Sequence, residues 1–141
     1  MLKRSICLSL VLILAIAFVC GVSADDDSEP ALDRYTHAKG VGAGLSISGS
    51  TAICVGKGRG TYSYTTTNIL VTLQRQPAGS SSWSNVTSWT ATASGMNTAL
   101  VNETYPASSG YSYRVRTRCQ IKDSDGNVLE TVYKYSSIWT I

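Results

Sequence analysis

The chain has 141 residues, a formal net charge of +3 and one histidine. Its length suits one domain, and so modest a charge excludes the charge density typical of a nucleic-acid-binding protein. The single histidine, His37, precedes the part expected to fold, which argues against a Ser-His-Asp or Cys-His catalytic site in the domain. A glycosidase needs paired carboxylates, and the domain has only four: Glu103, Asp123, Asp125 and Glu130. We therefore expect no enzymatic activity, no cofactor and no metal site.

The N-terminus predicts a cleaved signal peptide over residues 1–24. Lys3 and Arg4 precede an apolar run over residues 6–19, and the small residues at 22–24 suit a signal peptidase. The alternative of a membrane anchor is disfavoured, because the run is shorter than the roughly 20 residues that a spanning helix needs. We expect a secreted protein with no stable membrane insertion after cleavage.

Residues 25–42 are predicted to form a flexible leader, since they are acidic, then rich in glycine, and have no apolar period. The domain is expected over residues 43–141. It retains two cysteines, Cys54 and Cys119, an even pair in an oxidising compartment. One disulfide between them would close a 65-residue loop (119 − 54) and stabilise the fold by about 4 kcal/mol.

Within the domain no segment has a helical apolar stripe, and residues that favour strands dominate. We predict seven antiparallel strands, over residues 43–48, 51–57, 68–76, 83–92, 98–105, 111–122 and 128 to about 135. Whether the last one resumes at 138–139 stays open. Residues 58–60 and 62–64 are expected to lie in a loop. Seven short strands with polar turns predict an all-β, two-layer sandwich.

The sixth of these strands has the strongest signal, a period of two over twelve residues. One face carries six residues suited to a core, Tyr111, Tyr113, Val115, Thr117, Cys119 and Ile121. The other face carries Arg114, Arg116 and Arg118 among polar residues. Trp89, on the fourth strand, is also expected in the core.

The chain resembles known families in a few motifs. Cysteines on the second and sixth strands resemble the inter-sheet disulfide of immunoglobulin-like domains, and residues 111–117 resemble the sixth strand of fibronectin type III domains. The leader, the Ser-Gly-Ser-Thr-Ala-x-Cys segment at 48–54 and the Trp83…Trp89 pair resemble small secreted bacterial proteins, common in Firmicutes, without an assigned function. These resemblances imply an immunoglobulin-like sandwich and no particular activity.

The sequence also departs from the immunoglobulin pattern. The third strand has no tryptophan to pack on a disulfide, and Thr117 stands where the corner tyrosine would be. Tyr113 suits a fibronectin-like version of that corner. Cys54 shares a strand face with Ala52 and Gly56, so either small residues make room for the disulfide or a bulge shifts the register.

Two groups of residues are candidates for binding. The three arginines are spaced about 6.6–7 Å apart along their strand and suit an anionic polymer such as teichoic acid or a sulfated glycan. The alternative is a solvated face whose arginine stems cover apolar rings. Tyr62, Tyr64 and Trp83 fall in or beside loops, where they either stack on sugars or fill a partner's pocket, or else cap the sandwich.

These observations lead to one main functional hypothesis, a non-catalytic extracellular or cell-surface binding module. Its partner would be an extracellular protein or a cell-wall glycan. The alternative is a secreted effector, either a peptidase inhibitor or a small toxin, whose loop at 57–67 or 77–82 inserts into a target.

Overall fold

The computed structural model describes residues 35–141, so the predicted signal peptide and residues 25–34 of the predicted leader lie outside the described part. The described chain forms eight strands: β1 (Ala38–Ser48), β2 (Thr51–Gly60), β3 (Thr66–Pro77), β4 (Ser84–Ser94), β5 (Thr98–Pro106), β6 (Tyr111–Lys122), β7 (Val128–Tyr135) and β8 (Trp139–Thr140). None of the described residues forms a helix long and apolar enough to cross a membrane.

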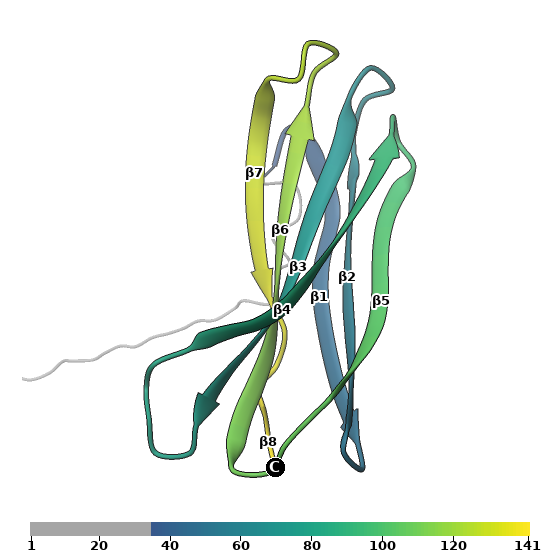
Figure 1. Ribbon diagram of the computed structural model, residues 1–141. Helices are drawn as coiled ribbons and strands as arrows, with labels where there is room; N and C mark the ends of the chain where they lie inside the picture. The colour runs from purple at the N-terminus through teal and green to yellow at the C-terminus, as the bar shows by residue number, and fades with distance from the viewer. Residues whose placement is uncertain (1–34) are drawn as a thin grey trace, which may run out of the picture. The chain divides into compact units, whose positions relative to one another are not determined.

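The strands form two antiparallel sheets, which confirms the predicted all-β, two-layer architecture (Figure 1). One sheet has the order β1-β2-β5, and the other has the order β4-β3-β6-β7. The last strand does resume, because β8 pairs with Ser112 and Tyr113 of β6. The bounds predicted for β6 are confirmed to the residue.

The first strand starts earlier than predicted, at Ala38 rather than at residue 43, so residues 38–42 are strand and not leader. The Glu130 carboxylate of β7 explains this difference. It accepts hydrogen bonds from the backbone N–H groups of Thr36 at 3.2 Å, His37 at 2.8 Å and Ala38 at 2.8 Å. A contact between residues more than 90 positions apart fixes the entry into β1, and no local pattern announces it.

The second strand also runs further than predicted, through Gly60, although residues 58–60 suggested a loop. Its inward face carries only small residues: Ala52, Cys54, Gly56, Gly58 and Gly60. We call these five residues the small-residue column. A Cβ on Gly58 would lie 2.7 Å from the Cys119 Sγ, and one on Gly56 would lie 2.6 Å from the Thr117 Oγ1. The glycines therefore serve close approach of the facing sheet rather than a turn.

The core is supplied mainly by the facing sheet. Its largest members are fully buried side chains of β3 and β6: Ile69, Val71, Leu73, Tyr113, Val115 and Ile121. Trp89 is partly buried and packs against this cluster, and Tyr113 is inaccessible, so both are core residues as predicted.

The Tyr113 hydroxyl contacts the backbone of the segment that connects β5 to β6. It accepts a hydrogen bond from the Ser108 N–H at 2.9 Å and lies 3.5 Å from the Ser108 carbonyl oxygen. This contact fastens the connection between β5 and β6 to the end of the core.

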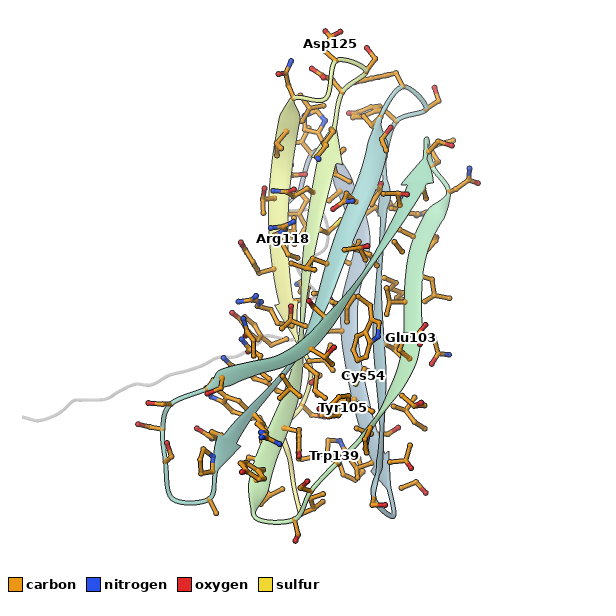
Figure 2. The ribbon with its side chains drawn as sticks, viewed as in Figure 1. Cys54, Glu103, Tyr105, Arg118, Asp125 and Trp139 are labelled. Carbon is orange, nitrogen blue, oxygen red and sulfur yellow. The ribbon has the colours of Figure 1, made fainter. Side chains whose placement is uncertain are left out.

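The predicted disulfide is not present: both Cys54 and Cys119 are buried free thiols. Cys119 packs opposite Gly58, and Gly58 lies four residues beyond Cys54 on the same face of β2. Four residues span about 13 Å of strand, whereas bridged cysteines need Cα atoms within about 7 Å. In Figure 2, Cys54 lies at a different level of the sandwich from Arg118, the neighbour of Cys119. The small residues beside Cys54 thus make room for the other sheet and not for a disulfide.

Reducing agent is therefore expected to leave the stability of the domain unchanged. Burial raises the pKa of each thiol to about 11, so little reactive thiolate forms at neutral pH. Urea unfolding with and without dithiothreitol should agree, and alkylation followed by mass analysis should label two thiols, only after unfolding. A loss of about 4 kcal/mol on reduction would show that the bridge forms.

Candidate functional site

The outer face of the β4-β3-β6-β7 sheet carries all three predicted arginines. Arg114, Arg116 and Arg118 alternate along β6 with buried residues and point away from the core. The strand pairing sets Arg116 opposite Tyr135 and Arg118 opposite Tyr133 on β7. Opposite positions on one sheet face bring their side chains into reach of each other.

Two of the arginines lie over neighbouring aromatic rings, and Arg118 is placed beside Tyr133 by the strand pairing. The Arg114 guanidinium carbon lies 4.2 Å from the ring centroid of Trp83 and 4.6 Å from that of Tyr135. The Arg116 guanidinium carbon lies 5.9 Å from the ring centroid of Tyr133. These distances fit cation–π contacts. We call the set Trp83, Arg114, Tyr135, Arg116, Tyr133 and Arg118 the arginine–aromatic ladder.

Two amide side chains fix one end of the ladder. The Arg114 Nε donates to the Gln74 Oε1 at 2.8 Å, and the Gln74 Nε2 donates to the Asn85 Oδ1 at 2.9 Å. Gln74 is buried and lies opposite Arg114 on the neighbouring strand β3, so it holds the guanidinium from the side. The guanidinium is therefore oriented by a hydrogen bond as well as by two rings.

The ladder is positively charged and lacks acidic partners. Within residues 35–141 none of its arginines forms an ion pair, and the Nε atoms of Arg116 and Arg118 are buried with no hydrogen-bond partner there. Residues 35–141 contain nine lysines and arginines and four carboxylates, which gives a net charge of +5 (9 − 4). Glu103 lies on the other sheet, and Glu130 is occupied by three backbone N–H groups. The charge of the ladder is thus not neutralised by the described domain.

The predicted loop aromatics separate into two places. Trp83 directly precedes β4 and joins the ladder. Tyr62 and Tyr64 lie in the connection before β3, at the opposite end of that strand. Their rings stack at 5.3 Å between centroids, and His37 meets Tyr62 edge-on at 5.7 Å. Tyr62 is 37% exposed and Tyr64 is 60% exposed. Of these three aromatics, the structure thus brings only Trp83 to the arginines.

Sequence reasoning missed Tyr133 and Tyr135. They are 51% and 52% exposed on the outer face of β7, and their spacing of two residues was the available signal. Their role depends on the pairing between β6 and β7, which contains a bulge between Ile121 and Lys122. The bulge changes which β7 residues share a face with the arginines, so the alternation alone was not sufficient.

Within the described part of the chain, no group of three or more histidine, cysteine, aspartate and glutamate side chains could hold a metal ion.

Comparisons with known proteins add little to the site. No family model matches the chain, and no curated protein is similar to it. The chain is similar to a solved structure of a β-glucosidase from Kluyveromyces marxianus, with 11% identity and a TM-score of 0.41. The match covers 73% of this chain but only 16% of that enzyme. A likeness of this degree transfers no activity.

Proposed function

We propose that this protein is an exported, non-catalytic module that binds anionic polysaccharide through the arginine–aromatic ladder. The observation that supports the proposal is the row of three guanidinium groups, two of them stacked on aromatic rings and all three unpaired with carboxylates within residues 35–141. Unpaired arginines on a sheet face are available to an anion from outside.

The chemistry of the row favours a polymer over a single small anion. A guanidinium binds carboxylate, sulfate or phosphate groups through parallel N–H bonds, and three of them in line suit repeated anionic groups. The exposed rings of Tyr133 and Tyr135 add flat apolar surface beside the charges, which suits the C–H faces of sugars.

We further propose that the sandwich is of the fibronectin type III kind. Its fourth strand pairs with the third, so that β4, β3, β6 and β7 form the larger sheet. The constant-type immunoglobulin domain instead places its fourth strand beside the fifth. The Tyr113 hydroxyl, bonded to the backbone five residues upstream, supports the same assignment.

Binding to immobilised heparin, a sulfated glycan, tests the proposed function. The triple variant Arg114→Gln, Arg116→Gln, Arg118→Gln removes the guanidinium groups and keeps most of each side-chain stem. We expect its affinity to fall about 100-fold, equivalent to roughly 2.7 kcal/mol. Wild-type binding should weaken as salt rises, because salt screens exposed charges.

A matched control separates the ladder from net charge. The triple variant Lys39→Gln, Lys57→Gln, Arg59→Gln also removes three positive charges, but from β1 and β2 of the other sheet. It should retain affinity within about threefold. An equal loss in both variants would show that only net charge matters. Unchanged binding by the ladder variant would overturn the site.

The proposed alternative is the secreted effector. Part of the loop expected over residues 57–67 is strand, since β2 runs to Gly60. In the rest of that loop, Tyr62 and Tyr64 are the exposed aromatic side chains that could contact a target. Inhibition of a peptidase, or killing of cells, that survives the ladder variant and is lost in a Tyr62→Ser, Tyr64→Ser variant would favour the effector.

A further inference from the structure

A pocket of about 400 Å³ lies at the seam between the two sheets, and none of the three ladder arginines lines it. In Figure 1, β4 and β5 lie close where they are joined and diverge toward the start of β4. The pocket occupies this diverging side. It is lined by the end of β3, the start of β4, the end of β5 and the start of β6: Arg75, Pro77, Ser84, Asn85, Val86, Tyr105 and Tyr111.

Arg75 supplies the charge of the pocket. Its guanidinium carbon lies 4.2 Å from the ring centroid of Tyr111, and Arg75 forms no ion pair within residues 35–141. A guanidinium has five N–H donors, so Arg75, which also hydrogen-bonds Tyr113, keeps donors at its edge that can bind two oxygens of one carboxylate. The pocket therefore has a preformed place for a planar anion.

The rest of the lining indicates what carries the anion. Tyr105 and Tyr111 offer phenol rings with hydroxyl groups, and Ser84 and Asn85 add a hydroxyl and an amide. Aliphatic surface comes only from Pro77 and Val86. Tyrosine rings with polar partners suit a hydroxylated ring with an apolar face, whereas the side chain of a peptide C-terminus would need a more apolar pocket.

The size of the pocket limits the ligand. Small-molecule pockets in proteins measure about 300–1,000 Å³, and this one is at the small end. It suits one sugar unit rather than an oligosaccharide. An open seam at a sheet edge leaves room for the rest of a chain to continue outside.

We propose that the seam pocket binds a hexuronate unit, with the carboxylate on Arg75 and the sugar ring against Tyr105. This site does not rest on the proposed function of the ladder. The two are nevertheless adjacent, because Asn85 lines the pocket and accepts a hydrogen bond from Gln74, which in turn accepts one from Arg114.

Titration of the secreted domain with sodium glucuronate, followed by backbone amide NMR, tests this proposal. We expect saturable shifts at residues 84–86, 105 and 111, and binding by glucose at least tenfold weaker. Arg75→Gln should weaken glucuronate binding about tenfold or more, and Arg75→Lys, which keeps the charge but not the planar fork, should fall between the two. If Arg75→Gln does not fold, Arg75→Lys still tests whether the planar guanidinium is needed.

Arg59→Gln is the matched control, since it removes one arginine from β2, outside both the ladder and the pocket, and should leave glucuronate binding unchanged. Equal binding of glucose and glucuronate, shifts centred elsewhere, or no binding would each overturn the pocket assignment. Stronger binding of acetyl-alanyl-alanine, a peptide with a free carboxylate, would overturn the sugar in favour of a peptide end. Loss of heparin binding in the ladder variant with intact glucuronate binding would separate the two sites.

Discussion

Replacing Gly56 with alanine is expected to destabilise the domain by about 3 kcal/mol, at the upper end of the usual cost of overpacking a core. The added Cβ would overlap the Val71 Cγ2 and would lie 2.6 Å from the Thr117 Oγ1. Both neighbours are fully buried, so neither moves aside without displacing others. Urea unfolding monitored by tryptophan fluorescence measures the change in the free energy of unfolding.

Gly44→Ala is the matched control for Gly56→Ala. A Cβ on Gly44 would meet the Val55 Cβ at 3.8 Å, an ordinary contact, and Gly44 lies in β1 without a positive φ. The same chemical change should therefore alter stability by less than about 1 kcal/mol. Similar losses in both variants would mean that strand glycines matter through backbone entropy and not through the approach of the sheets.

Replacing Glu130 with alanine is expected to cost about 2 kcal/mol, since hydrogen bonds to a charged group contribute about 1.5–3 kcal/mol each when well buried and this site is only partly buried. The change leaves the backbone N–H groups of Thr36, His37 and Ala38 without their acceptor. Urea unfolding gives the global effect. Hydrogen exchange of the amides at 36–38 should rise before exchange elsewhere.

Two further variants sharpen the Glu130 test. Glu130→Gln keeps an acceptor oxygen but loses the charge, so its loss should be smaller. Glu103→Ala removes an exposed carboxylate on β5 and should change stability by less than about 0.5 kcal/mol. If Glu130→Ala and Glu103→Ala behave alike, the three hydrogen bonds do not hold the start of β1.

Much of the fold could be predicted because its signals are local. The alternation on β6 gave its bounds and its buried face, and the turn residues placed the other strands to within a few residues. The errors concern contacts between distant residues. The start of β1 depends on Glu130, and the end of β2 depends on Cys119 packing against Gly58.

The prediction of a disulfide was wrong for a related reason. Strand pairing fixes neighbours within one sheet, but the level at which one sheet packs on the other is set by side-chain volume. Cys54 and Cys119 each face the core, as alternation predicts, yet they lie at different levels of it. A sequence pattern predicts which face of a strand a residue lies on. It does not predict which residue of the facing sheet will pack against it.

The candidate site was predicted in part. Alternation placed the three arginines on an outer face, and Trp83, which the sequence singled out, stacks with Arg114. The other rings of the ladder, Tyr133 and Tyr135, depend on the pairing of β6 with β7. The pocket around Arg75 gave no signal at all, because its lining comes from four strands. Such a site forms only when the two sheets pack against each other.

The small-residue column has a consequence for how this domain can vary. The space in front of Gly56 is already taken by Val71 and Thr117, so the three positions share one fixed volume. An added methyl group at position 56 therefore fits only if the side chain at position 71 becomes smaller. We therefore expect Val71→Ala to act as a suppressor of Gly56→Ala, and residues 56 and 71 to covary among relatives of this protein.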